Sequence, residues 1–117
     1  YIDTNAAQVG SVTAVSGSGP AYFLVVMEAL EQAATDHGLD RETARLLTLE
    51  TAFGAAKMAL EGGEEPAKLR QRVTSPGGTT EQAIKILEQE QVMASFKKAV
   101  TAALHRAREL ADILGKD

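Results

Sequence analysis

Apolar residues along much of the chain recur at intervals of three and four, the period of an amphipathic helix. The clearest case is a heptad-like stripe near the C-terminus, formed by Phe96, Val100, Ala103, Ala107, Leu110 and Leu114. A stripe of this kind predicts a helix of about 20 residues that packs on one or two other helices. Gly115 should end it.

Glycine and proline residues divide the rest of the chain into four further predicted helices. The expected spans are residues 20–37, 40–62, a short helix started by Pro66 that covers residues 67–73, and a segment that begins at residue 79. Gly38 and the pair Gly62-Gly63 should end the first two helices, and Asp40 should cap the second at its N-terminus. Thr79 and Gln82 have the spacing of a capping box at the start of the fourth helix.

The same pattern predicts which segments are buried. Residues 22–27 are apolar on all sides, so the first half of the helix that begins at Pro20 should be buried all round. In the helix from residue 79 we expect three apolar residues to be buried, Ala83, Ile84 and Leu87. The first nineteen residues, by contrast, are interpreted as a linker or arm that ends in a flexible turn, Ser16-Gly17-Ser18-Gly19.

Composition supports an all-α fold. The chain has twenty alanines and twelve leucines against eight valines and four isoleucines, and Ala and Leu are strong helix formers. Its 117 residues are enough for one domain, spanning residues 1–117. Alanine fills little volume, and a small domain buries a modest share of its surface. We therefore expect a partner subunit or another domain to complete the core.

Charge and cysteine content exclude several classes of function. A net charge of −4 argues against nucleic-acid binding, which calls for a basic patch. The absence of cysteine removes disulfides, thiolate zinc sites and cysteine nucleophiles, and two histidines offer little for a metal site. The uncharged stretch of residues 4–27 is interrupted by polar residues, so neither a membrane span nor a signal peptide is predicted. These features are typical of a cytoplasmic domain.

Two segments, Ser16–Pro20 and Ser75–Thr80, place glycines and hydroxyl groups directly before a predicted helix. The N-terminus of a helix offers free N–H groups and a partial positive charge, which suit a phosphate or a carboxylate. The first segment lacks the residues of a P-loop, a dinucleotide fingerprint or a nucleophile elbow, so an ordinary capped turn is the simpler interpretation. The second is either a ligand-binding loop or a flexible linker between helices.

Taken together, three stretches resemble successive landmarks of pyrroline-5-carboxylate reductases: residues 12–22, 54–58 and 73–80. The resemblance covers nearly the whole chain. It implies the helical C-terminal domain of that family, about five helices that intertwine in a homodimer, with a fold like the C-terminal domain of 6-phosphogluconate dehydrogenase. An N-terminal Rossmann domain, which the family uses for its cofactor, is not found in these 117 residues.

The resemblance also implies an activity and a set of site residues. The family is an oxidoreductase of proline biosynthesis that passes a hydride from NADPH or NADH to 1-pyrroline-5-carboxylate and forms L-proline. By similarity, the substrate is bound by Ser75, Gly77, Gly78, Thr79 and Thr80. Thr80 would face the ring nitrogen as the catalytic residue. Ser18, Gly19 and Pro20 would lie near the nicotinamide, and no metal is implied.

Two questions stay open at the level of the sequence. Where the family often places glycine between the last two helices, this chain has Gln91, so the two helices could run together or bend there. The alternative function is a non-catalytic homodimerisation module, which would have no need of an intact loop at residues 75–80. The resemblance implies a dimer and allows higher assemblies of dimers.

Overall fold

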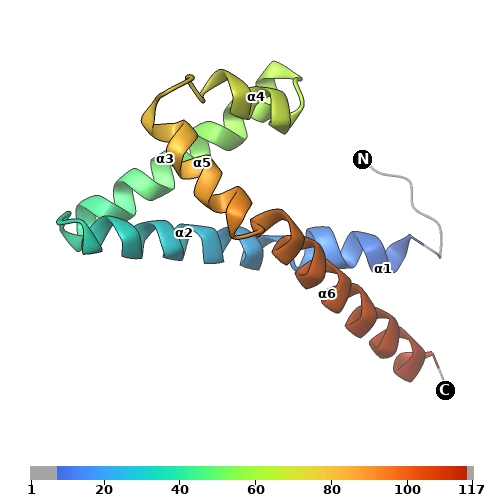
Figure 1. Cartoon of the computed structure of the whole chain (residues 1–117). Helices are drawn as coiled ribbons and strands as arrows, with labels where there is room; N and C mark the ends of the chain where they lie inside the picture. Colours follow the sequence, from blue (N-terminus) through green and yellow to red (C-terminus); the bar gives the residue numbers. More distant parts are fainter. Residues whose placement is uncertain (1–7, 116–117) are drawn as a thin grey trace. The chain divides into compact units, whose positions relative to one another are not determined.

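A computed structural model of the chain describes residues 8–115, which form helices connected by short turns and contain no strand (Figure 1). The all-α prediction is therefore confirmed. In chain order the helices are α1 (Val9–Val12), the π-helix η1 (Thr13–Gly17), α2 (Gly19–Asp36), α3 (Arg41–Gly62), α4 (Pro66–Arg72), α5 (Thr79–Gln89) and α6 (Val92–Leu114).

The chain divides into two compact units. The described residues of the first unit are 8–23 and 88–115, and the second unit comprises residues 24–87. The first unit thus joins the N-terminal helices to α6, and the second holds α3, α4 and most of α2 and α5.

The core of the first unit lies where α6 packs against η1 and α1. Ala14 is only 1% exposed there. A Cβ atom added to Gly10 would lie 3.1 Å from Cδ1 of Leu104, so the missing side chain lets α1 approach α6. The middle of the heptad-like stripe, from Val100 to Ala107, is half-buried, whereas Leu114 at its end is exposed. The predicted final helix and its end at Gly115 are confirmed.

The interpretation of the first nineteen residues as a linker is wrong for residues 9–17 and 19, which are helical, with Ser18 a bend between two helices; residues 1–7 lie outside the described part of the chain. The expected flexible turn is also wrong, because Ser16 and Gly17 belong to η1. The Ser18 N–H donates to the Thr13 carbonyl, five residues back, at 3.1 Å. The physical reason is tertiary: contact with α6 stabilises a helical path that the glycines and serines do not favour by themselves.

Local signals set the ends of the helices in the second unit. Gly38 has φ +105°, and its N–H and that of Leu39 donate to the carbonyls of Thr35 and Ala34, both at 3.1 Å. This is the hydrogen-bond pattern of a Schellman motif at the end of α2. Helix α3 ends one residue before Gly63, which is left-handed with φ +67°. Both predicted helix ends are confirmed.

The predicted cap at Asp40 is confirmed as well. Its two carboxylate oxygens accept hydrogen bonds from the backbone N–H and from the hydroxyl of Thr43, each at 2.9 Å. These bonds, led by the one from the backbone N–H, lower the pKa of Asp40 below its ordinary value of 3.8. Helix α4 begins at Pro66 as expected, and an ion pair between Glu64 and Arg72 spans it.

The burial predicted for two segments is wrong in the single chain. Phe23 is 69% exposed and most of its apolar neighbours up to residue 26 are also exposed. In α5, Ala83 and Leu87 are exposed and Ile84 is half-buried. The reason is that the chain's own helices leave these faces uncovered. Apolar residues left exposed in α2 and α5 agree with the expectation that a partner subunit completes the core.

Helices α5 and α6 are separate helices. Gln91 between them is left-handed, with φ 57° and ψ 43°. Its N–H donates to the Glu88 carbonyl at 3.0 Å, and its carbonyl accepts from the Ser95 N–H at 3.1 Å. Gln91 therefore adopts the backbone conformation that glycine takes most readily, which answers the question left open by the sequence.

The helical stretch Val9–Asp36 is long and apolar enough, by length and composition only, to cross a membrane, with a mean hydropathy of 1.3. One such helix is weak evidence, because the apolar core helix of a soluble protein has the same properties. It does not indicate a membrane protein.

Candidate functional site

The loop Ser75–Thr80 connects α4 to α5 and is built on a tight turn. The Gly78 N–H donates to the Ser75 carbonyl at 3.0 Å, Pro76 holds the second position, and Gly77 has φ +75°. These are the features of a type II turn, whose third residue needs a positive φ and is therefore usually glycine. A side chain at position 77 would be strained.

The turn is also compact and anchored. A Cβ atom added to Gly78 would lie 3.2 Å from the Ser75 carbonyl oxygen, so glycine keeps the backbone close at this point. On the other side, the hydroxyl of the half-buried Thr74 donates to the Arg70 carbonyl at 2.6 Å, which fastens the loop to the last turn of α4. The loop is thus a defined structure and not a flexible linker.

Free hydrogen-bond donors gather at the start of α5. Within the described part of the chain, the backbone N–H groups of Thr79, Thr80 and Glu81 donate no hydrogen bond. The hydroxyls of Thr79 and Thr80 form no hydrogen bond with residues 8–115 either, and both residues are exposed. Unpaired N–H groups and the positive end of the helix dipole suit a carboxylate or phosphate ligand.

The predicted capping box is wrong. Thr79 is already the first residue of α5, and its hydroxyl accepts no hydrogen bond from Gln82. Instead, a carboxylate oxygen of Glu81 accepts from the Gly77 N–H at 3.2 Å. The physical reason is the tight turn, which brings the N–H of Gly77 within reach of a first-turn side chain. The Lys85 ammonium lies 3.9 Å from the same oxygen and offsets part of its charge near the free donors.

The second set of predicted site residues lies where η1 meets α2. Ser18 is half-buried, and its carbonyl accepts from the Ala21 N–H at 3.0 Å. Gly19 is buried, although a Cβ atom added to it would meet no atom within 4 Å. Pro20 is exposed in the first turn of α2. The segment is therefore ordered and leaves room beside Gly19.

One residue at this junction was missed by sequence reasoning. The Tyr22 hydroxyl donates to the Ala14 carbonyl at 2.6 Å. The signal available in the sequence was a hydroxyl inside an apolar run, because a partly buried tyrosine usually finds a partner for its O–H. The identity of that partner depends on the π-helix, which the sequence did not indicate.

Chain geometry brings together the members of each set. Residues 75–80 form one turn and helix start in the second unit, and residues 18–20 form one junction in the first. The first set is shaped by local hydrogen bonds, whereas the second follows η1, which packs on α6.

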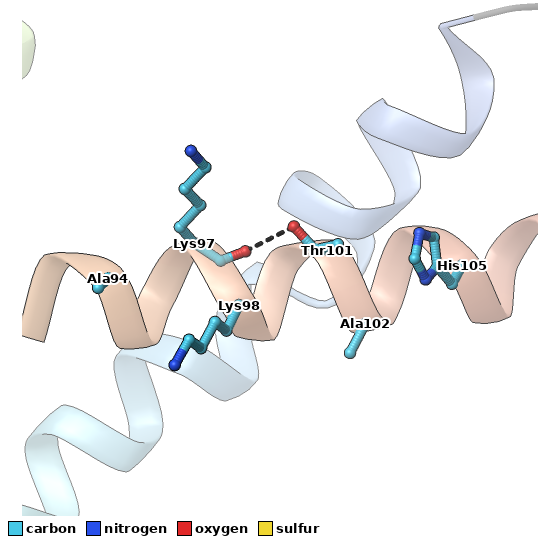
Figure 2. Close-up of a pocket in the computed structure, with 6 residues that line it drawn as sticks. All are labelled: Ala94, Lys97, Lys98, Thr101, Ala102 and His105. Atoms are coloured by element: carbon cyan, nitrogen blue, oxygen red, sulfur yellow. Dashed lines mark hydrogen bonds between the residues drawn. The ribbon is translucent and has the colours of Figure 1, made fainter.

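A shallow hollow along α6 is the other notable surface feature (Figure 2). It is lined by Ala94, Lys97, Lys98, Thr101, Ala102 and His105. All six come from one helix, on the side opposite the heptad-like stripe, and the Thr101 hydroxyl donates to the carbonyl of Lys97 at 2.8 Å. Among residues 8–115 no group of His, Asp or Glu side chains could hold a metal ion.

Comparison with known proteins points to the same family as the three stretches at residues 12–22, 54–58 and 73–80. Residues 6–110 match the family model described as pyrroline-5-carboxylate reductase dimerisation. A pyrroline-5-carboxylate reductase of Pseudomonas aeruginosa is 56% identical over 110 residues, which are 94% of this chain and 40% of that protein. The reductase of Methanosarcina acetivorans is 48% identical over 86% of this chain and 37% of that protein.

Solved structures show the same fold. A reductase of this name from Coxiella burnetii superposes with a TM-score of 0.89 and is 55% identical, over 92% of this chain and 40% of that one. The pyrroline carboxylate reductase of Plasmodium falciparum, solved with NADP bound, superposes with a TM-score of 0.88 at 30% identity, over 92% of this chain and 41% of that one.

The chain spans about two fifths of the length of the relatives it matches. The matched model covers residues 6–110, well over half of the chain. The chain therefore belongs to the pyrroline-5-carboxylate reductase family, in the region that forms the family's dimerisation domain.

Proposed function

We propose that this chain is the dimerisation and substrate-binding domain of a reductase that converts 1-pyrroline-5-carboxylate to L-proline, the last step of proline biosynthesis. The observation that carries the proposal, beside family membership, is the set of free donors at the start of α5. A non-catalytic module would not need an ordered turn that leaves these donors open.

The substrate carboxylate would bind at the N–H groups of Thr79 and Thr80. Among the described residues these two N–H groups have no acceptor, whereas the Gly78 N–H donates to the Ser75 carbonyl. The part of Gly77 and Gly78 is then to form the turn and to let the ligand approach the backbone. A carboxylate at a helix N-terminus is favoured by the dipole as well as by the hydrogen bonds.

The Thr80 hydroxyl would face the ring nitrogen of the imine. A threonine hydroxyl is too weak an acid to protonate the nitrogen by itself, so its role is to orient the ring and to polarise the C=N bond. It has no hydrogen-bond partner among residues 8–115, which leaves it available for that contact.

NADPH or NADH would supply the hydride for the C=N carbon. We propose that a Rossmann domain outside this chain binds most of the cofactor, and that Ser18, Gly19 and Pro20 lie against the nicotinamide end. The room beside Gly19 and the NADP bound in the Plasmodium falciparum relative support this assignment. The protein would act in the cytoplasm, as a homodimer or an assembly of dimers.

The test compares residues 1–117 with the complete protein from which they come. We expect the complete protein to oxidise NADPH or NADH with 1-pyrroline-5-carboxylate as acceptor, and residues 1–117 alone to show no turnover, because nothing orients the hydride donor. Turnover by residues 1–117 alone would contradict the placement of the cofactor site. A complete protein that dimerises without reducing the imine would instead favour the non-catalytic module.

A further inference from the structure

Tyr22 closes a hydrogen-bonded loop around the junction between η1 and α2. Its hydroxyl donates to the Ala14 carbonyl, eight residues earlier, at 2.6 Å, and the bond is partly buried. In an α-helix that carbonyl would accept the N–H of Ser18, four residues on. Here the π-turn directs the Ser18 N–H to Thr13, and the tyrosine hydroxyl takes the place of the backbone donor at Ala14.

The acceptor and the donor of this hydrogen bond belong to two different helices, η1 and α2. Ala14 is 1% exposed in the contact between η1 and α6, so its carbonyl is held by the core of the first unit. Tyr22 stands in the first turn of α2. Ser18, Gly19 and Pro20 lie between these two points, and a fixed distance between Ala14 and Tyr22 restricts the paths their backbone can take. A π-turn in a helix is often found at a functional site.

We propose that Tyr22 is a positioning residue, whose hydroxyl holds the backbone of residues 18–20 in the shape that meets the nicotinamide end of the cofactor. This proposal rests on the proposed function for its second half, the effect on the cofactor. Its first half, the hold on the backbone, concerns the structure alone. Tyr22 itself need not touch cofactor or substrate.

The experiment compares two variants of the complete protein with the parent. Tyr22→Phe removes the hydroxyl and keeps the ring. Thr101→Val is the matched control, because it removes a hydroxyl whose hydrogen bond lies within α6, to the carbonyl of Lys97 one turn earlier (Figure 2). Hydrogen exchange of the Ser18 amide and steady-state kinetics with both substrates are measured on all three proteins.

In Tyr22→Phe we expect the Ser18 amide to exchange about 2- to 12-fold faster, the range that corresponds to one lost hydrogen bond of ordinary strength. The KM for the nicotinamide cofactor should rise by a similar factor, while the KM for 1-pyrroline-5-carboxylate stays unchanged. Thr101→Val should change neither. This split separates positioning from a general loss of stability, which would not act on one substrate alone.

An unchanged exchange rate of the Ser18 amide in Tyr22→Phe would overturn the proposal, because the Tyr22 hydroxyl would then not hold the backbone of residues 18–20. Faster exchange with an unchanged KM for the cofactor, or a rise in the KM for the imine instead, would overturn the positioning role. If the parent protein has no reductase activity, the proposed function fails and the link to the cofactor falls with it. The exchange measurement then still decides whether Tyr22 holds the junction.

Discussion

Thr79 and Thr80 are neighbours in the first turn of α5, yet we expect their substitutions to have different consequences. In the complete protein, Thr80→Ala should lower kcat by about 5- to 30-fold, equivalent to roughly 1–2 kcal/mol, because a polarising hydrogen bond is lost and water replaces part of it. Steady-state kinetics and an unfolding curve of the same preparation measure the effect on activity and confirm that the fold is kept.

Thr79→Ala serves as the matched control. Its hydroxyl forms no hydrogen bond in the described part of the chain, so the free energy of unfolding should change by no more than about 0.5 kcal/mol. The turnover number should stay close to that of the parent. A large loss of kcat in Thr79→Ala together with full activity in Thr80→Ala would show that the two roles are reversed.

Asp40 makes the stability of α3 depend on pH. Its pKa is lowered in the folded state, chiefly by the hydrogen bond from the Thr43 backbone N–H. The stabilisation is therefore complete above the ordinary pKa of 3.8 and is lost as the pH falls through the lower value of the folded protein. Asp40→Asn keeps an acceptor for Thr43 but removes the titrating charge.

We expect Asp40→Asn to unfold at a lower temperature than the parent at about pH 6, and the gap to narrow towards about pH 3. Thermal unfolding followed by circular dichroism at both pH values measures it. A gap that is constant across this range would show that the charge of Asp40 contributes nothing beyond its hydrogen bonds.

At the scale of the element, the junction between α5 and α6 carries a local strain. Gln91 adopts φ 57°, a left-handed conformation that costs a residue with a Cβ atom about 1–2 kcal/mol, whereas glycine adopts it readily. Gln91→Gly should therefore raise the free energy of unfolding by about 1 kcal/mol, after the greater entropy of glycine in the unfolded chain is counted. Urea unfolding measures the change.

Gln82→Gly is the control for this prediction. Gln82 lies inside α5 with ordinary helical neighbours, so the same exchange should lower the free energy of unfolding by about 1 kcal/mol. Opposite signs for the two variants would tie the effect to the left-handed backbone at residue 91. A loss of stability in Gln91→Gly would mean that the glutamine side chain stabilises the junction more than its backbone strains it.

At the scale of the whole molecule, the exposed apolar surface is too large for a stable monomer. Phe53 is 68% exposed, Phe23 is 69% exposed and Leu60 is 85% exposed. Exposed apolar surface on this scale marks an interaction site, and the family model is one of dimerisation. We expect residues 1–117 to sediment as a homodimer at micromolar concentration, with an interface above about 2,000 Å² that resembles a divided core.

Phe53→Glu should shift the chain towards monomer, because the interface would then bury a charge without a partner. Glu50→Gln, one turn earlier on the same helix, should leave the dimer intact, since it replaces an exposed side chain by one of the same size. Analytical ultracentrifugation of both variants decides between the two outcomes. If the parent chain sediments as a monomer at micromolar concentration, the expected homodimer is contradicted whatever the variants do.

The sequence by itself determined the features that depend on residues a few positions apart. Gly38 ends α2, Asp40 caps α3 through Thr43, and Pro66 begins α4, because each signal acts through hydrogen bonds or dihedral preferences within about one helical turn. The glycine-rich turn at residues 75–78 is of the same kind. The three stretches at residues 12–22, 54–58 and 73–80 also indicated the family, because short motifs can be recognised without knowing the fold.

Only the tertiary structure decided what distant residues do to one another. The serine- and glycine-rich stretch around residue 17 is helical because α6 packs against it. Residues 23–26 and much of α5 are exposed because no helix of the same chain covers them. The partner of the Tyr22 hydroxyl depends on a π-turn that moves the hydrogen-bond register by one residue. Hydrophobic periodicity records which face of a helix is apolar, and the packing of other segments determines what covers that face.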